Sequence, residues 1–144
     1  MKPISEILDR KGGMVLCVDE NETVLDAISL MADVNIGAVL VKRGDTIAGI
    51  FTERDYLQKI ALASRSSRET RVKNVMSSPV ISAKPDDTVS DCMEVMTNCR
   101  CRHLPIVDGD KLLGIVSIGD LVKSLVEEKQ SEIDHLSQYI SGSY

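Results

Sequence analysis

The sequence predicts an α/β protein made of two β-α-β-β-α units, related by a pseudo-twofold axis and followed by a long C-terminal helix. The first observation is an internal repeat. Shifting the chain by 65 residues lays 18–60 over 83–125 without a gap and makes nine positions identical. The other two are the helix-start signals and the strand-turn-strand patterns that recur in both copies. Half of a 144-residue chain buries a core poorly alone, so we expect the units to cover each other's sheets.

Each unit is expected to begin with a short strand and a helix. Residues 15–18 and 80–83 are the strand candidates. Thr23-x-x-Asp26 and Thr88-x-x-Asp91 have the spacing of a capping box, in which the hydroxyl accepts from an N–H of the first helical turn. Apolar residues then recur at i, i+3, i+4 and i+7, which predicts one buried stripe per helix. The stripes are Val24, Ala27, Ile28 and Met31, and Val89, Cys92, Met93 and Met96.

Two further strands around a Gly-Asp turn follow in each unit. They span 38–41 and 47–51 in the first copy, and 104–107 and 112–116 in the second. Pro105 has no N–H to donate, so we expect its strand to have a free edge or to start nearby. A second helix is expected from about Asp55 and from about Asp120.

These patterns divide the chain into residues 1–70 and 71–144. The Ser- and Arg-rich stretch 63–70 is expected to be an exposed connector. The final helix continues with an apolar stripe that lies among acidic residues. We expect this stripe to pack on its own domain or on a second subunit; the second arrangement gives a homodimer, which we predict. Its acidic polar face disfavours a membrane-surface helix. The stripe comprises Val122, Leu125, Val126, Ile133, Leu136 and Ile140.

Composition excludes several classes of function. A net charge of −5 argues against a general nucleic-acid binder. No signal peptide is recognisable and no stretch approaches the ~18 apolar residues of a membrane span, so we expect a cytoplasmic protein, or one in the soluble content of an organelle, that does not bind membranes. The four cysteines are too few and too irregular for a disulfide framework. No phosphate loop, dinucleotide-binding glycine motif or nucleophile elbow is present, so no catalysis is expected.

The strand-to-helix turn of each copy carries the most information. The turns run from Gly49 through Thr52 to Asp55 and from Gly114 through Ser117 to Asp120. Ser/Thr-x-x-Asp is in itself a capping box. The same hydroxyl and carboxylate at a helix N-terminus also suit an anion and a sugar, because an ionised Asp accepts from both hydroxyls of a ribose.

The repeat and its two G-h-h-[ST]-x-x-D turns (h, hydrophobic) resemble the cystathionine-β-synthase (CBS) domain, whose tandem pair is called a Bateman module. The stretches 75–80 and 102–107 match as well, and the chain looks like the stand-alone pairs of bacteria and plant organelles. The resemblance implies a regulatory module without catalytic residues or a catalytic cofactor. It implies binding of AMP, ADP, ATP or NAD(H), with S-adenosylmethionine less favoured, to sense energy or redox state and signal to an unidentified client protein.

The resemblance also implies two nucleotide sites, each using residues of both repeats. Asp55 and Asp120 would hold ribose hydroxyls, apolar residues would hold adenine, and Arg54, Arg102 and His103 could pair with phosphate. Because the copies differ at these positions, we expect unequal affinities. The first site comprises Ile50, Thr52, Arg54, Asp55, Met76, Pro79, Ile81, Cys101, Arg102 and His103. The second comprises Met14, Leu16, Ile36, Gly37, Ala38, Ile115, Ser117 and Asp120.

Two alternatives remain open at this point. The protein could be an interaction adaptor that does not respond to nucleotides. It could also be a metal or redox switch using Cys99-x-Cys101-x-His103, although this spacing differs from that of common structural zinc sites, and we predict no metal site.

Overall fold

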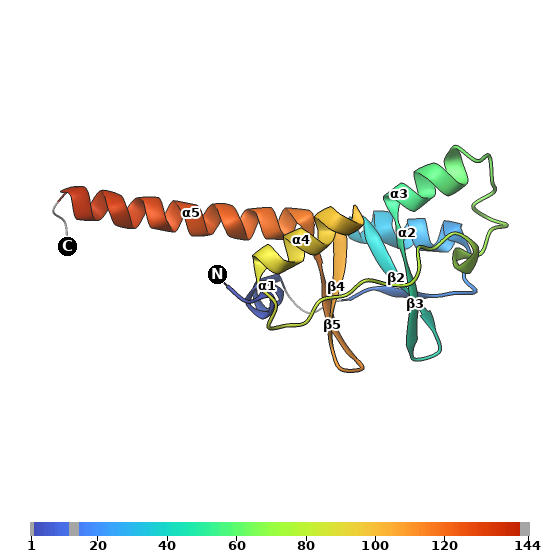
Figure 1. Ribbon diagram of the computed structural model, residues 1–144. Coiled ribbons are helices and arrows are strands. Elements are labelled where there is room, and N and C mark those ends of the chain that lie inside the picture. Colours follow the sequence, from blue (N-terminus) through green and yellow to red (C-terminus); the bar gives the residue numbers. More distant parts are fainter. Residues whose placement is uncertain (1, 12–14, 142–144) are drawn as a thin grey trace. The chain divides into compact units, whose positions relative to one another are not determined.

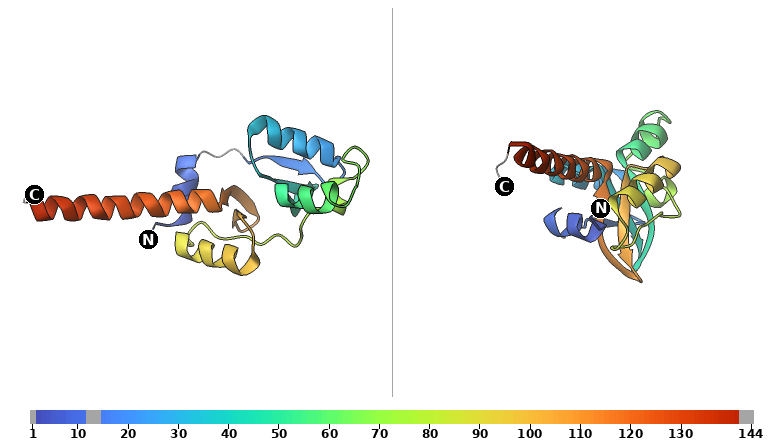
Figure 2. Two further views of the ribbon diagram at one scale, coloured as in Figure 1. Left: turned by 90° about the horizontal axis from the view of Figure 1, so that it is seen from above. Right: turned by 60° about the vertical axis from the view of Figure 1, so that its left-hand side comes forward.

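The computed structural model describes residues 2–11 and 15–141, which fold as parts of two compact units (Figures 1 and 2). Residues 14–81 make up what we call the first-repeat unit. Residues 1–13 together with 82–144 make up the second-repeat unit. Mixed helices and short sheets in each unit confirm the predicted α/β class.

A three-stranded sheet forms the first-repeat unit. Its strands are β1 (Cys17–Asp19), β2 (Ala38–Arg43) and β3 (Thr46–Thr52), with β1 parallel and β3 antiparallel to β2. The helices are α2 (Val24–Val34) and α3 (Glu53–Tyr56), the latter continuing as a π-helical turn over Leu57–Ala61. A 3₁₀ turn, Val72–Asn74, completes the unit.

The core of this unit confirms the predicted stripe of α2. Val24, Ala27 and Met31 are buried against the β2 and β3 side chains Val41 and Phe51. The helix begins where predicted, because the Thr23 hydroxyl accepts from the Asp26 N–H at 3.2 Å.

The second-repeat unit repeats these bounds with the shift of 65 residues. It contains α4 (Val89–Cys99), β4 (His103–Asp108), β5 (Lys111–Ser117) and α5 (Ile118–Ser141). Asp91 and Thr88 form the full reciprocal capping box. Gly44 and Gly109, at equivalent hairpin positions, have φ of 63° and 61°, a conformation that favours glycine. The repeat therefore extends to turn geometry.

The prediction of a strand at 80–83 is wrong. Only Ala83 makes a bridge, to Ile106, and β4 pairs with β5 in a two-stranded sheet. In the first repeat, β1 is held by the bonds Leu40 N–H to Leu16 O and Glu20 N–H to Lys42 O. Prolines 105 and 85 occupy the two equivalent donor positions and have no N–H, so both flanking bonds are lost. The expected free edge at Pro105 is therefore only partly present: β4 is an outer strand that starts two residues earlier, at His103, and Ala83 alone bonds to its edge, through the Pro105 carbonyl and the Val107 N–H.

Helix α1 (Ile4–Lys11), which the sequence analysis did not predict, packs against β5 and α5 of the second-repeat unit (Figure 1). Its Ile4 and Ile7 are buried in that core, as Val72 and Val75 are in the core of the first-repeat unit. The two segments are equivalent, since residue 3 bridges Thr88 just as residue 71 bridges Thr23. Thus α1, which precedes the first repeat, packs in the second-repeat unit, and the segment 71–75, which precedes the second repeat, packs in the first-repeat unit.

The connector 63–70 is mostly exposed, as expected, but it also caps α2. Thr70 is buried, and the carbonyls of Ser67 and Thr70 accept the N–H groups of Leu25 and Val24. The connector thereby satisfies two donors at the N-terminus of α2. Among the described helices, none is long and apolar enough to cross a bilayer.

Candidate functional site

Asp55 lies at the N-terminus of α3, where β3 ends at Thr52. Its N–H donates to Thr52 Oγ1 at 3.2 Å, and the Thr52 N–H donates to Asp55 Oδ2 at 3.0 Å. Asp55 is 5% exposed. The predicted capping box is therefore present, and its carboxylate is buried.

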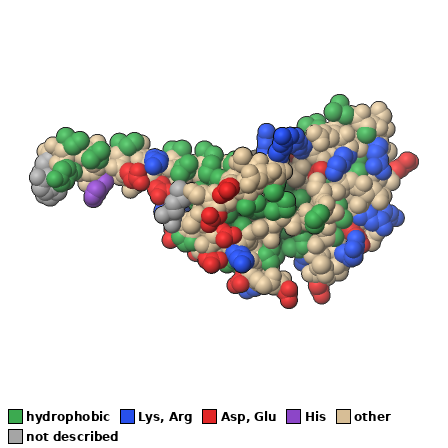
Figure 3. All heavy atoms as spheres, in the orientation of Figure 1, with side chains coloured by type: hydrophobic (Ala, Val, Ile, Leu, Met, Phe, Trp, Pro, Cys, Tyr) green, Lys and Arg blue, Asp and Glu red, His purple; other side chains and the backbone are tan. Residues whose placement is uncertain are grey.

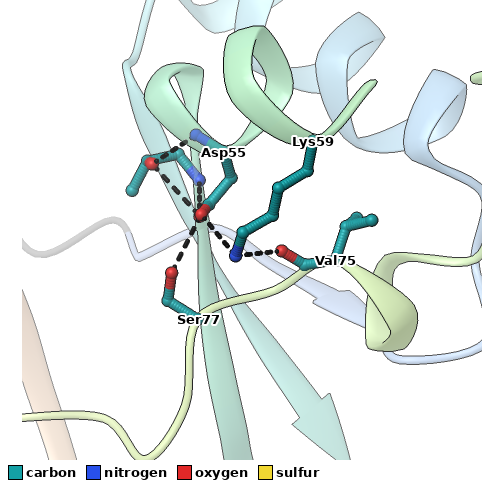
Figure 4. A network of polar contacts seen from close by, with 5 residues as sticks. Asp55, Lys59, Val75 and Ser77 are labelled. Carbon is teal, nitrogen blue, oxygen red and sulfur yellow. Dashed lines mark hydrogen bonds and ion pairs between the residues drawn. The ribbon is translucent and has the colours of Figure 1, made fainter. Parts of the chain in front are cut away.

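Several polar contacts converge on the Asp55 carboxylate (Figure 4), and they engage both of its oxygens. The Thr52 hydroxyl donates to Oδ2 at 3.1 Å, in addition to the Thr52 N–H. On Oδ1, the Ser77 hydroxyl donates at 2.9 Å and Lys59 Nζ lies at 2.9 Å. A carboxylate offers about four acceptor positions, so this one is saturated by groups of its own unit.

Asp120 occupies the equivalent corner between β5 and α5. Its Oδ2 accepts the Ser117 N–H at 2.8 Å and Lys11 Nζ at 2.7 Å, while the Asp120 N–H donates to Ser117 Oγ at 3.1 Å. Both bonds to the carboxylate, from the Ser117 N–H and from Lys11, involve Oδ2, and the side chain is 25% exposed. Asp120 is thus more open than Asp55.

The ionisation of Asp120 follows from these contacts. Burial raises its pKa, but the hydrogen bonds from Lys11 and from Ser117 outweigh that effect and hold the pKa below its usual range. The carboxylate is therefore charged at neutral pH, as an acceptor of ribose hydroxyls must be.

Two lysines that were not predicted from the sequence each bridge a carboxylate and a backbone carbonyl. Lys59 Nζ donates to the carbonyl of Val75 at 2.8 Å, and Lys11 Nζ donates to that of Ile115 at 2.9 Å. They are not equivalent in the repeat, because Lys59 follows Asp55 by one helical turn whereas Lys11 belongs to α1. The i,i+4 spacing could have revealed Lys59. No local pattern points to Lys11, 109 residues before its partner.

Ser77 was missed as well, and its position is set by backbone packing. The Ser77 carbonyl accepts the Ile50 N–H at 3.0 Å, and the Ser77 N–H donates to the Ile50 carbonyl at 2.8 Å. A Cβ on Gly49 would lie 2.6 Å from Met76 Sδ and 2.8 Å from the Ser77 carbonyl oxygen. Glycine at this position therefore lets the segment dock edge-on against β3.

Residues at the start of β2 and β4 lie beside the backbone of Thr52 and Ser117, respectively, each in the same repeat. The Gly37 carbonyl accepts the Glu53 N–H at 3.1 Å, and the Arg102 carbonyl accepts the Ile118 N–H at 2.8 Å. Ala38 is paired with Thr52, and residue 103 with Ser117, in the strand registers. These four residues were predicted to belong to the site of the aspartate in the other repeat, and that assignment stays a prediction.

The other predicted residues are distributed over both units. Cys101 and Ile115 are half-buried in the second-repeat unit; Leu16 and Ile50 are half-buried in the first. Ile36 is half-buried and lines a shallow apolar hollow between α2 and α3. The exposed members are Arg54, Pro79 and Ile81. Met14 lies outside the described residues.

The cysteine pair shows no metal-binding arrangement within residues 2–11 and 15–141, where no three His, Cys, Asp or Glu side chains gather as ligands. Cys99 is exposed and Cys101 half-buried. Burial, followed by the neighbouring Cys99, raises the pKa of Cys101, which favours the neutral thiol over the metal-binding thiolate.

Comparison with known proteins agrees with this architecture. The family model "CBS domain" matches residues 4–62 and 72–127. The CBS domain-containing protein CBSX3, mitochondrial, of Arabidopsis thaliana is 40% identical over 150 residues, covering 98% of this chain and 73% of the relative. CBS domain-containing protein YhcV of Bacillus subtilis is 35% identical, covering 82% and 84%. A solved CBS-domain structure from Burkholderia ambifaria has a TM-score of 0.84 and 47% identity, covering 88% and 95%.

Proposed function

The chain belongs to the CBS-domain family as a tandem pair, and we propose that it is a non-enzymatic sensor that binds an adenine nucleotide, AMP, ADP, ATP or NAD(H), and signals its level to a partner protein. CBS pairs are generally regulatory modules that bind adenine nucleotides. The observation that carries the proposal for this chain is the Ser117–Asp120 corner. It offers an ionised carboxylate at a helix N-terminus.

We assign the tighter nucleotide site to Asp120. A ribose hydroxyl can donate to its Oδ1 without displacing Lys11 or Ser117, which both contact Oδ2. At Asp55 the same hydroxyl must first replace the Ser77 hydroxyl or the Lys59 ammonium. Displacing a charge-assisted partner costs about 1.5–3 kcal/mol, or roughly tenfold to a hundredfold in affinity.

Calorimetric titration with AMP, ADP, ATP, NAD and NADH tests the proposal. We expect at least one ligand to bind the wild type, and Asp120→Asn to abolish the tighter event. Asp110→Asn is the matched control, since Asp110 is exposed at the hairpin turn of the same unit. In the wild type, each 2′-deoxy or 3′-deoxy analogue should bind more weakly in the tighter event than the parent nucleotide does. Unchanged affinity for the analogues would show that no ribose contact is made by Asp120.

Asp55 provides a test in the opposite direction. Ser77→Ala removes one donor from Oδ1 and leaves the two backbone bonds to Ile50 in place. We therefore expect this substitution to strengthen the weaker binding event. A loss of that event in Ser77→Ala would instead make Ser77 a ligand contact and contradict the proposed closure of Asp55.

The adaptor function is the second candidate. It is favoured by the saturation of Asp55, which is satisfied without any ligand. If no nucleotide binds the wild type in the titration, the adaptor function replaces the sensor function.

A further inference from the structure

Helix α5 is longer than its own unit requires. Its buried residues are Leu121 and Ser124, and an ion pair of 2.9 Å joins Glu127 to Arg10 of α1. All residues over 129–141 are exposed, and both views in Figure 2 show the helix running on beyond α4 and β5. A helix of about 12 residues without packing is marginal in water. The C-terminal half of α5 therefore calls for a partner.

The exposed part carries an apolar stripe with coiled-coil spacing. Residues 122, 126, 133, 136 and 140 are apolar and follow a 4-3 spacing in which only position 129, a lysine, is polar. Their exposed fractions are 44% for Val122, 61% for Val126, 56% for Ile133, 58% for Leu136 and 76% for Ile140. Hydrophobic side chains gather along one edge of the helix in Figure 3. The spacing of 3.5 residues fits another helix better than a flat surface.

The charges of α5 favour a helix over a membrane as the partner. Glu127, Glu128, Glu132 and Asp134 lie between the apolar positions, with Lys129 among them. Surface-seeking helices carry basic polar faces, because cell membranes are anionic.

We propose that α5 pairs antiparallel with α5 of a second copy of this chain, centred on position 131. In this register Val122 lies opposite Ile140 of the second copy, and Val126 lies opposite its Leu136. Every apolar residue of the stripe is then covered, over about 27 Å of helix at 1.5 Å per residue. The pairing rests on α5 alone and does not depend on nucleotide binding.

Charge selects the antiparallel direction. Lys129 of each copy lies opposite Ile133 and beside Glu132 of the other copy, so two Lys–Glu pairs flank the centre. Lys129 already lies 3.5 Å from Glu132 of its own helix, with both side chains more than 60% exposed, so the pair can exchange partners. A parallel pairing would place Lys129 against Lys129 within the apolar seam, where like charges repel.

Disulfide trapping distinguishes the registers. Val126→Cys and Leu136→Cys proteins are prepared separately, mixed and oxidised with copper phenanthroline, and disulfide-linked peptides are identified by mass spectrometry. We expect a bond between positions 126 and 136 in the mixture and no self-linked dimer through these positions in either protein alone. Self-linking of each single variant would establish the parallel pairing, and absence of every linked product through these positions would exclude α5 as a self-pairing helix; either result overturns the proposal.

A second substitution shows that the stripe itself forms the contact. Ile133→Glu, added to both cysteine variants, should reduce the 126–136 product at least tenfold. Gln138→Glu adds the same charge on the opposite face of α5 and should leave the product unchanged. Both positions are exposed, so neither change disturbs the core. Equal yields from these two variants would also overturn the proposal.

Discussion

Replacing Asp55 by Ala should destabilise the protein more than replacing Asp120 by Ala, although the two residues are equivalent in the repeat. The substitution removes the acceptor of four contacts within 3.1 Å, three hydrogen bonds and one ion pair. The Asp55 side chain is 8% exposed, against 25% for Asp120, which has two donors on a single oxygen.

The loss of unfolding free energy in Asp55→Ala depends on how far each donor that loses its acceptor can bind water instead. The part-buried Thr52 N–H loses a bond to a charged group, which costs about 1.5–3 kcal/mol. The Ser77 hydroxyl is exposed and adds about 1 kcal/mol, and Lys59, 38% exposed, adds at most about 1 kcal/mol. The sum is about 2.5–5 kcal/mol for Asp55→Ala. The same reasoning gives about 2 kcal/mol for Asp120→Ala.

Urea unfolding followed by circular dichroism, without nucleotide, measures the difference. At about 2–4 °C per kcal/mol, Asp55→Ala should also lower the melting temperature by on the order of 10 °C. If Asp55→Ala costs no more than Asp120→Ala, the saturated carboxylate is not as buried as described and the reasoning fails. Binding experiments should therefore use Asn at position 55, because a binding loss in the Ala variant would be confounded by unfolding.

Three other outcomes are expected. As pH falls below about 4, the wild type should lose unfolding free energy relative to Asp120→Asn. The pKa of Asp120 is lower in the folded protein than in the unfolded chain, so the unfolded chain takes up the proton first and is favoured. If the unfolding free energies of the two proteins, measured with urea, change with pH in parallel, the prediction is wrong. Gly49→Ala should destabilise the protein more than Gly114→Ala. The new Cβ at position 49 meets the Ser77 backbone oxygen at 2.8 Å, whereas the one at position 114 meets only a Leu8 side-chain methyl at 2.7 Å. Equal urea midpoints for the two variants would refute this. Iodoacetamide should label exposed Cys99 first and Cys92 last, since burial, aided by nearby carboxylates, raises the Cys92 pKa to about 11. Peptide mass spectrometry over time measures the order of labelling, and the reverse order would contradict the prediction.

Features coded by neighbouring residues were predictable from the sequence. The capping box of Thr88 and Asp91 and the glycine turn at Gly109 depend on residues within one turn of each other. Helix and hairpin bounds therefore followed from the repeat. The strand expected at 80–83 failed because its bonds depend on the distant Pro105 as well as on Pro85.

The candidate corners were predictable only in part. Thr52, Asp55, Ser117 and Asp120 were identified by spacing, and the structure confirms that each pair forms a helix cap. Their partners were not identified, because Lys11 reaches Asp120 across 109 residues and nothing local marks it. The assignment of nucleotide contacts across the repeats stays a prediction.

The exchanged packing of α1 and the 3₁₀ turn has a consequence for synthesis on the ribosome. Residues 14–81 form a continuous unit that can fold as soon as they leave the exit tunnel. Ile4 and Ile7 are made before this unit, yet the core that buries them also needs Leu121, so they stay in water until Leu121 has emerged. Deleting α1 would therefore damage the second-repeat unit, although α1 is separated from the rest of that unit in the sequence by residues 14–81.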